Sequence, residues 1–306
     1  MLQLCRMKHQ IHASFIGAGE IGSALAALVS HSGAHVEQWD ADTSKVPNQK
    51  SLAEVVTSAD VLFFCVPSWI LRKAMEPIKL LLNKKTICVF VSKGIEEKTN
   101  LFIHDLAKDI LPRGQSVVLL SGPMLAEELV DGHGGAACVG TKSLSDLKMI
   151  EHLFSCDDLH LTHAPDVKSV AVAAVLKNVY AITLGIAAGL NWGDNRKGWL
   201  CSEAIQEMIM IMNALKADPS YVLSQAGIGD FIATGMSQYS SNQTLGRELV
   251  EKSHCERKSE GCQALPSLVK KLGVKNMKSL PILSALHRII EKGTNAKSEF
   301  ETLFCG

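Results

Sequence analysis

Residues 13–33 read ASFIGAGEIGSALAALVSHSG and join a short apolar run to an amphipathic helical stretch through a glycine-rich turn. The turn has the pattern G-x-G-x-x-G and consists of Gly17, Ala18, Gly19, Glu20, Ile21 and Gly22. Gly17 permits a tight turn, Gly19 lets another molecule approach the backbone, and Gly22 lets the helix pack closely on the strand. This strand–turn–helix unit predicts the first element of a doubly wound α/β sheet.

The same turn predicts a binding site for a dinucleotide. The N-terminus of the helix offers free N–H groups and a positive dipole to a pyrophosphate. A second strand-like run, AHVEQWD, ends at Asp40, about twenty residues after the turn, where a carboxylate accepts hydrogen bonds from the adenosine ribose. Because an acid there disfavours a 2′-phosphate, we expect NAD(H) rather than NADP(H). A glycine turn without a ligand is the alternative, and the flanking strand and helix disfavour it.

The rest of the first half alternates apolar, β-branched runs with helical stretches, which indicates a parallel sheet with helices on both faces. The candidate strands are HASFIG at 12–17, AHVEQWD at 34–40, DVLFFCVP at 60–67, TICVFVSKG at 86–94 and SVVLLSG at 116–122. Gly134–Val139 and Asp158–Thr162 could add edge strands before the pattern changes near Pro165. We therefore predict an NAD-binding Rossmann domain over residues 1–165. Ligands of such sheets bind beyond the carboxyl ends of the strands, so Pro67 and Lys93 should line the cofactor cleft.

From residue 166 onward the strand patterns stop and helical periodicities follow. The predicted helices are Val167–Gly189, Leu200–Leu215, Pro219–Ser224, Thr244–Lys252, Leu265–Leu272 and Pro281–Glu291. We predict an all-α substrate-binding domain over residues 166–306, with the ligand site in the cleft between the two domains. Residues 293–306 are expected to be a loosely held tail or a final short helix.

Composition excludes several classes of protein. The 306 residues are 47% hydrophobic and 20% charged, with 31 Lys+Arg against 31 Asp+Glu, which excludes a disordered chain and predicts neither a nucleic-acid nor a membrane partner. Nine cysteines without a C-x-x-C pair predict reduced thiols, no metal site and a cytoplasmic protein. The first ten residues contain no apolar segment of signal-peptide length, and Met7 is an alternative start to Met1.

Two lysines and an aspartate are candidates for catalysis. Lys177 lies between apolar turns of a predicted helix, where desolvation would lower its pKa toward the neutral range that a general acid or base needs. A lysine at the helix edge with its head in water is the alternative. Asp230 and Thr234 follow at i and i+4, on one face if the segment is helical, although an N-cap aspartate in a glycine-rich loop is the simpler interpretation.

The order and spacing of these motifs resemble the NAD-dependent glycerol-3-phosphate dehydrogenase family over nearly the whole chain. The matching stretches are GAGEIGSALA, VPS, VSKG, LSGP, LKNVYAI, GDNRK, GIGDFIAT and SEG, followed by the PI segment at Pro281. The resemblance implies hydride transfer between dihydroxyacetone phosphate and glycerol-3-phosphate, in a cytoplasmic homodimer that serves phospholipid synthesis or redox balance. It also implies a Rossmann domain followed by a helical domain.

The resemblance assigns roles to individual residues. Lys177 would be the general acid/base, Lys93 would bind and polarise the substrate oxygen, and Asp230 would orient Lys177. The cofactor would contact the glycine turn, Asp40, Pro67, Lys93, Ala126 and Glu260. The substrate would contact Lys93, Gly122, Asn178, Thr234, Ser241 and Asn242.

The chain also departs from the family pattern at three places. The family has Ser-Arg-Asn where this chain has Ser240-Ser241-Asn242, so the arginine that grips the substrate phosphate is replaced by Ser241. Met124 follows the GP motif where a small polar residue is usual, and the loop ADTSKVPNQK at 41–50 is short. A nearby cation could replace the arginine, the candidates being Arg196, Lys197 and Arg247. The alternatives are a different hydroxy, keto or carrier-linked glyceryl substrate, or an NAD-binding regulatory protein without catalysis.

Overall fold

Seven strands of the first half form one sheet in the order β2-β1-β3-β4-β5-β6-β7. The structure is a computed structural model that describes residues 10–252 and 257–305. The strands are β1 (His12–Ile16), β2 (His35–Trp39), β3 (Val61–Phe64), β4 (Ile87–Phe90), β5 (Ser116–Ser121), β6 (Gly135–Gly140) and β7 (Leu159–Ala164). The strand order reverses direction between β1 and β3, and this is the position at which open α/β sheets bind their ligands.

One strand pair differs from the predicted parallel arrangement. Every described pair of the sheet is parallel except β5 with β6, which is antiparallel. The only helix between these strands, α5 (Ala126–Val130), has five residues and rises about 7 Å, whereas a six-residue strand spans about 20 Å. The chain therefore turns back at the same end of the sheet. As a result Gly134–Val139, expected at an edge, forms the inner strand β6, and β7 is the edge.

Helices cover both faces of this sheet. They are α1 (Glu20–His31), α2 (Leu52–Thr57), α3 (Ser68–Ile78), α4 (Ile103–Ile110), α5 and α6 (Leu144–Leu153). Successive side chains of a strand point to opposite faces, so Phe63 packs in the core beside α1 and α6, while Leu62 and Phe64 pack beside α2, α3 and α4. The near-continuous apolar strands are thus buried on both sides, as the sequence predicts.

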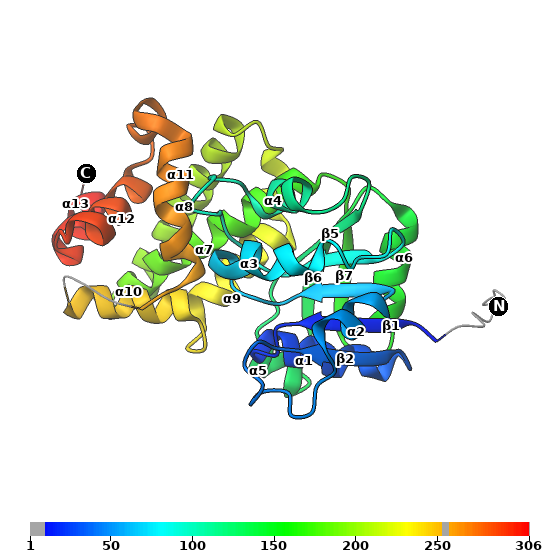
Figure 1. Cartoon of the computed structure of the whole chain (residues 1–306). Coiled ribbons are helices and arrows are strands. Elements are labelled where there is room, and N and C mark those ends of the chain that lie inside the picture. The colour runs from blue at the N-terminus through cyan, green and yellow to red at the C-terminus, as the bar shows by residue number, and fades with distance from the viewer. Residues whose placement is uncertain (1–9, 253–256, 306) are drawn as a thin grey trace, which may run out of the picture.

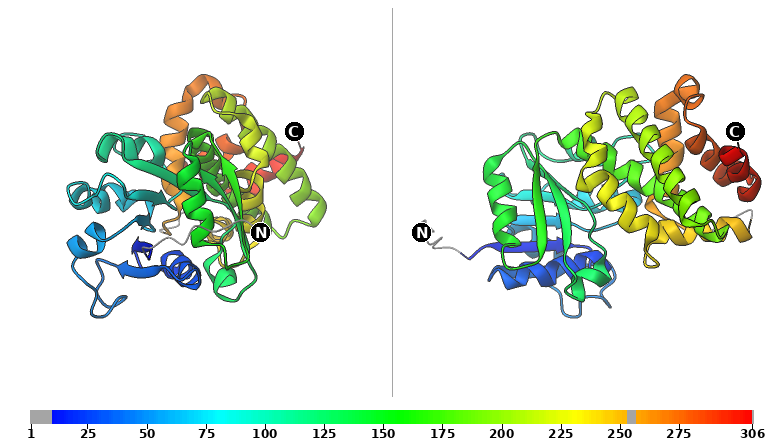
Figure 2. Two further views of the ribbon diagram at one scale, coloured as in Figure 1. Left: turned by 90° about the vertical axis from the view of Figure 1, so that its right-hand side faces the viewer. Right: turned by 180° about the vertical axis from the view of Figure 1, so that it is seen from behind.

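The second half is helical in the residues that the structure describes. Its helices are α7 (Val167–Gly189), α8 (Asp194–Ala214), α9 (Asp230–Met236), α10 (Ser241–Glu251), α11 (Glu260–Met277), α12 (Pro281–Lys292) and α13 (Ala296–Cys305). A 3₁₀ turn, η1 (Pro219–Leu223), and a π-type turn, η2 (Gln225–Gly229), precede α9. Seen from behind, this helical half extends from one end of the sheet (Figure 2).

The ends of several helices differ from their predicted positions. Helix α8 begins six residues before Leu200, because Gly193 and the polar residues after it form its exposed first turns. Of the two alternatives for residues 293–306, the final helix is observed: Phe300 of α13 is fully buried and lies 5.7 Å from Trp192, centroid to centroid. Phe304 of α13 also lies 5.2 Å from Trp199 of α8, centroid to centroid, so α13 is packed against α8 and the turn before it rather than loosely held.

Helix α7 joins the two halves of the molecule (Figure 1). It packs against β5 and β6 on one side and against α8 to α11 on the other. Among the described residues it is the one helix long and apolar enough to cross a membrane, and that apolar window is entirely buried inside the protein. Its composition therefore reflects its place at the centre of the core, as predicted. The exact domain boundary after residue 165 stays a prediction.

Candidate active site

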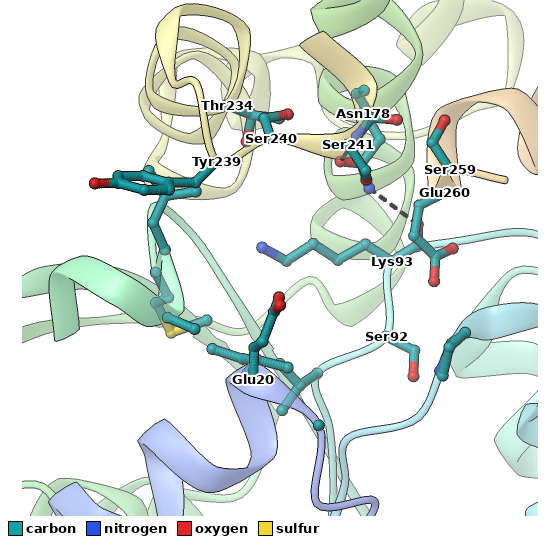
Figure 3. A pocket seen from close by; sticks show the side chains of 18 of the residues that line it. Glu20, Ser92, Lys93, Asn178, Thr234, Tyr239, Ser240, Ser241, Ser259 and Glu260 are labelled. Atoms are coloured by element: carbon teal, nitrogen blue, oxygen red, sulfur yellow. Dashed lines mark hydrogen bonds between the residues drawn. The ribbon is translucent and has the colours of Figure 1, made fainter. Parts of the chain in front are cut away.

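Two adjoining cavities open at the carboxyl ends of β1, β3 and β4. One has a volume of about 390 Å³ and is lined by both halves of the molecule, and the other, of about 510 Å³, lies over the first half. They share Gly19, Cys65, Val66 and Pro67. We call the first the central cavity and the second the adenosine cavity, because the latter is bounded by Asp40. Figure 3 shows the central cavity.

The glycine turn leads from β1 into α1 at the floor of these cavities. Gly17 has a φ of 101°, and a Cβ there would lie 2.8 Å from the carbonyl oxygen of Cys65. A Cβ on Gly22 would lie 2.0 Å from the carbonyl oxygen of Gly17, so the helix packs directly on the turn. Gly19 faces open space, and no side chain caps the N-terminus of α1. Glu20 and Ile21 line the central cavity, which leaves the first N–H groups of α1 beside it.

Asp40 lies at the end of β2, against the glycine turn. Its Oδ2 accepts a hydrogen bond of 2.8 Å from the backbone N–H of Ala18 and lies 3.5 Å from the ammonium of Lys45. Gln49 brackets the backbone of Asp40 with two hydrogen bonds of 2.8 Å, so the short loop after β2 folds back onto its own start. The carboxylate therefore closes one side of the adenosine cavity and lies beside a lysine that sequence reasoning did not select.

Lys93 and Lys177 line the central cavity and meet at Asp230, which lies buried behind its wall, although 84 and 53 residues separate the three along the chain. Asp230 accepts hydrogen bonds from Lys93 Nζ at 2.6 Å and pairs with Lys177 Nζ at 3.0 Å, one lysine on each carboxylate oxygen. Lys177 Nζ also donates to Thr234 Oγ1 at 2.8 Å, and Lys93 Nζ donates to the carbonyl of Gly122 at 3.0 Å. Asp230 is the first residue of α9, so its carboxylate and the Thr234 hydroxyl do share one helical face, 3.0 Å apart.

Burial gives these groups unusual protonation behaviour. Desolvation lowers the pKa of Lys177 to about 8, partly offset by attraction to Asp230. Burial alone would raise the pKa of Asp230, but attraction to Lys177 and Lys93 outweighs it and lowers that pKa. Asp230 is thus ionised at neutral pH while Lys177 titrates within reach of it. A lysine that can hold or release a proton therefore lies at the cavity wall.

Asn178 and Asn242 connect the helices around the cavity. Asn178 Nδ2 donates to the backbone carbonyl of Lys93 at 3.2 Å, a contact drawn in Figure 3, and Asn178 Oδ1 accepts from Asn242 Nδ2 at 2.9 Å. Asn242 Oδ1 in turn accepts from the backbone N–H of Gly261 at 3.0 Å. Both amides line the cavity and are buried, and much of their hydrogen-bonding capacity serves to hold β4, α7, α10 and α11 together.

Glu260 bridges the two halves of the molecule. Its carboxylate accepts hydrogen bonds from the backbone N–H of Ser68 at 2.8 Å and from Ser68 Oγ at 2.5 Å. Burial raises the pKa of Glu260, and the hydrogen bonds from Ser68 oppose that rise. A Cβ on Gly94 would lie 2.1 Å from Ser68 Oγ, so the glycine of the SKG motif makes room for this bridge.

Most of the other predicted site residues also line the central cavity. Pro67, Met124, Ala126, Thr234 and Ser241 contribute to its wall. Gly122 is not among the lining residues; its carbonyl lies behind Lys93, and a Cβ at this position would lie 2.2 Å from the carbonyl oxygen of Ala136. Gly122 therefore supports Lys93 through the backbone rather than forming the cavity surface.

The three cations suggested as replacements for the missing arginine do not line this cavity. Arg196 pairs with Glu301 at 2.8 Å and its guanidinium lies 4.3 Å from the ring centroid of Phe304. Lys197 lies 3.7 Å from Asp194 at the start of α8, and Arg247 is exposed on α10. These three residues lie near the site motifs in the sequence, but α8 and α10 direct their side chains to the outer surface.

The structure adds two residues that sequence reasoning missed, Tyr239 and Lys258. Tyr239 is half exposed and lies on the rim, as Figure 3 shows. Lys258 lies two residues before Glu260 of the SEG motif, and that motif was the one signal in the sequence that could have led to it.

Comparisons with known proteins point to one family. The sequence profile described as "NAD-dependent glycerol-3-phosphate dehydrogenase N-terminus" matches residues 43–146, and the corresponding C-terminus profile matches residues 166–301. Curated relatives named glycerol-3-phosphate dehydrogenase [NAD(P)+] include one from Clostridium tetani, 29% identical over 93% of this chain and 89% of the relative. The relative from Bacillus subtilis (strain 168) is 28% identical over 95% of this chain and 93% of its own length.

Solved structures agree on the fold. The glycerol-3-phosphate dehydrogenase of Coxiella burnetii superposes with a TM-score of 0.80 at 20% identity, covering 96% of this chain and 99% of that one. That of Plasmodium falciparum gives 0.82 at 19% identity, covering 96% and 95%. Because both family profiles match in order and the relatives span nearly the whole chain, this protein belongs to the NAD-dependent glycerol-3-phosphate dehydrogenase family.

Proposed function

We propose that this protein interconverts dihydroxyacetone phosphate and glycerol-3-phosphate, using NAD(H) as the hydride carrier. Membership of the family supports the reaction. The observation that carries the proposal is the Lys93–Asp230–Lys177 cluster, whose two lysines line the same cavity as the start of α1. A proton donor beside a dinucleotide-type turn is the arrangement that reduction of a ketone requires.

The residues of the cleft fit a dinucleotide. The first turn of α1 is uncapped and Gly19 faces open space, which suits a pyrophosphate. Asp40 closes the adenosine cavity, and the adjoining central cavity provides room for the nicotinamide between Pro67 and Ala126. When bound, NAD(H) supplies or accepts the hydride. We assign the preference for NAD(H) over NADP(H) to Asp40, whose charge opposes a 2′-phosphate.

Lys177 is the general acid and base in this proposal. In the direction of reduction its ammonium donates a proton to the carbonyl oxygen as the hydride reaches the carbonyl carbon, and the neutral amine accepts that proton in reverse. Asp230 holds the two ammonium groups apart, one on each oxygen, and thereby positions both. Lys93 polarises the same substrate oxygen, and Thr234, Ser241, Asn178 and Asn242 form the substrate wall together with Gly122 behind Lys93.

The reaction places the protein in a wider setting. We infer a cytoplasmic enzyme that acts on a small-molecule substrate, forms a homodimer and supplies glycerol-3-phosphate to phospholipid synthesis. The absence of a cysteine framework, and the complete burial of the apolar helix α7, are compatible with this setting.

Oxidation of NADH by dihydroxyacetone phosphate tests the proposal. Lys177→Met replaces the ammonium by an apolar side chain of similar length and should lower kcat by about 10²- to 10⁴-fold, the usual contribution of general acid catalysis, while the KM for NADH stays within a factor of about two. Lys275→Met, on the exposed side of α11, is the matched control and should behave as wild type. Full activity of Lys177→Met would contradict the assignment.

Ser241 favours one second candidate, a dehydrogenase for a substrate without a phosphate. Loss of a bidentate, permanently charged donor weakens selection for a phosphate group. Unphosphorylated dihydroxyacetone and a carboxylate or thioester analogue should therefore be assayed beside the triose phosphate. Faster turnover of one of these compounds would replace the proposed substrate, and NADH binding without any turnover would indicate a regulatory protein instead.

A further inference from the structure

We propose that Lys258 binds the phosphate group of the substrate, in the role that an arginine at the position of Ser241 has in the family pattern. The inference rests on the proposed function, since it concerns the substrate of that same site. It assigns a substrate-binding residue that none of the motifs identified in the sequence contains. Three observations support it. The other lysines of the cavity are paired with Asp230, the segment that carries Lys258 is anchored by hydrogen bonds, and the charged residues of the cavity are unevenly placed.

Among the described residues, Lys258 is the lysine of the central cavity whose ammonium group has no partner. Of the described residues that line this cavity three are lysines, and two of them, Lys93 and Lys177, share the carboxylate of Asp230. Lys258 forms no ion pair or hydrogen bond through its ammonium with any residue in 10–252 or 257–305, and it is exposed. A phosphate dianion in this cavity could therefore pair with the ammonium of Lys258. It would also be attracted by the single net positive charge of the Lys93–Asp230–Lys177 cluster.

The backbone beside Lys258 is held in place by hydrogen bonds of the residues that follow it. Ser259 is fully buried and its Oγ accepts a hydrogen bond of 3.3 Å from the N–H of Cys262, which caps α11. Glu260 is fixed by Ser68, and the N–H of Gly261 donates to Asn242. Because Asn242 follows Ser241 directly, these bonds hold the base of Lys258 next to the segment that has lost the arginine.

The carboxylates that line the cavity are those of Glu20, Glu127 and Glu260, and that of Glu260 is held by two hydrogen bonds from Ser68. Ser241, labelled in Figure 3, lines the cavity and opens α10, an eleven-residue helix. Its N-cap, Ser240, accepts a hydrogen bond of 3.2 Å from the N–H of Gln243, so the N–H groups of Ser241 and Asn242 are those without an acceptor within the helix. Glu20 lies on the opposite side of the cavity in the same view. An anionic group is therefore repelled from the Glu20 side and attracted toward Ser241 and Lys258.

The exchange of arginine for lysine has a consequence for selectivity. An arginine holds a phosphate through two parallel N–H donors in a fixed plane, whereas the ammonium of Lys258 is a point charge on a flexible stem. We therefore expect binding of the phosphate by charge, with the direction of the group set by Ser241 and the start of α10.

Steady-state kinetics of Lys258→Gln test the inference. The KM for dihydroxyacetone phosphate should rise by about tenfold or more, as expected for loss of a charged hydrogen bond, while the KM for NADH changes less than about twofold. The kcat/KM for unphosphorylated dihydroxyacetone should not change. Lys275→Gln is the matched control, because it removes an equally exposed lysine from α11 outside the cavity.

A second substitution keeps the test decisive. Introducing Ser241→Arg into Lys258→Gln should restore most of the lost affinity for dihydroxyacetone phosphate, because it returns a cation to the same end of the cavity. An unchanged KM for dihydroxyacetone phosphate in Lys258→Gln would overturn the inference. A rise confined to the KM for NADH would also overturn it, by assigning Lys258 to the cofactor.

Calorimetry separates this inference from the proposed function. Wild-type protein that does not turn over dihydroxyacetone phosphate would refute the function alone. Titration of inorganic phosphate into the NADH-saturated protein would then still test Lys258. Phosphate binding by wild type that is lost in Lys258→Gln supports the site. Equal binding by wild type and Lys258→Gln, or no binding by wild type, overturns it.

Discussion

Lys177 shows how one residue depends on its surroundings. Its side chain is 5% exposed, and its ammonium donates a hydrogen bond to Thr234 and forms an ion pair with Asp230. Desolvation disfavours the charge, whereas Asp230 favours it, and desolvation is the larger effect. Without Asp230 the pKa of Lys177 would be lower still, and without burial it would be higher.

The proposed role of Lys177 predicts a pH dependence of the reaction. In that mechanism reduction needs the protonated lysine, so its rate should fall as pH rises through about 8, and oxidation needs the neutral amine, so its rate should rise over the same interval. Initial rates in both directions from pH 6 to 10, at saturating cofactor, measure this.

Asp230→Asn provides the control for that profile. Loss of the Asp230 charge removes the attraction that raises the pKa of Lys177, so the midpoint of both profiles should move to lower pH. A midpoint that stays in place, or moves upward, would mean that another group titrates. Because Lys177, Asp230 and Lys93 interact, the observed midpoint belongs to the cluster as a whole.

At the scale of elements, close contact between the glycine turn and α1 decides whether the cofactor site forms. Gly22 lies in α1 where no side chain fits, since its Cβ would meet the carbonyl oxygen of Gly17 at 2.0 Å. In the proposed cofactor site, the N-terminus of α1 can bind the pyrophosphate only while this contact is kept. The last glycine of the G-x-G-x-x-G pattern is therefore needed for the packing of α1 on the turn as much as for binding of the cofactor.

Gly22→Ala should displace α1 from the turn. We expect the KM for NADH to rise by about tenfold or more, because the N–H groups of α1 move away from the pyrophosphate position, together with a lower melting temperature. Gly198→Ala is the control: Gly198 lies in α8 with nothing within 4 Å of its Cβ position, so alanine there should leave the KM unchanged and stabilise the helix by about 0.5–1 kcal/mol. Wild-type affinity for NADH in Gly22→Ala would contradict this account.

At the scale of the whole molecule, the sheet and the helical half share one core. The largest buried apolar cluster runs from the sheet, through Leu62 and Phe90, to α7 at Leu176 and on to α12 at Leu286. The Ser68–Glu260 hydrogen bonds add a polar connection across the cleft. The two halves that the sequence distinguishes are thus expected to unfold together.

Differential scanning calorimetry should show one transition, which NADH moves to higher temperature without splitting it. At a free concentration of 100 times its Kd, a ligand of the native state adds about 2.7 kcal/mol to the free energy of unfolding. The same NADH concentration should raise the melting temperature of Gly22→Ala less. Two separate transitions, with only the first moved by NADH, would show instead that the halves unfold independently.

The sequence by itself determined the order of elements, the glycine turn and the family, because these depend on local patterns and on motif order. Hydrophobic patterns predicted the strands, since the central ones such as β3 and β4 are buried on both faces, and they predicted α7 as a buried helix around Lys177. They could not give the direction of β6, which depends on the reach of the five-residue α5.

Only the tertiary structure decided which charges meet. Lys93, Lys177 and Asp230 converge because the end of β4, α7 and α9 pack around one cavity, and no spacing along the chain encodes that. For the same reason Arg196, Lys197 and Arg247, which were suggested as phosphate ligands, point elsewhere, while Lys258 lies at the cavity. A sequence pattern predicts which face of a helix is buried. It does not predict which cavity the side chains of the other face approach, because that depends on how whole helices pack.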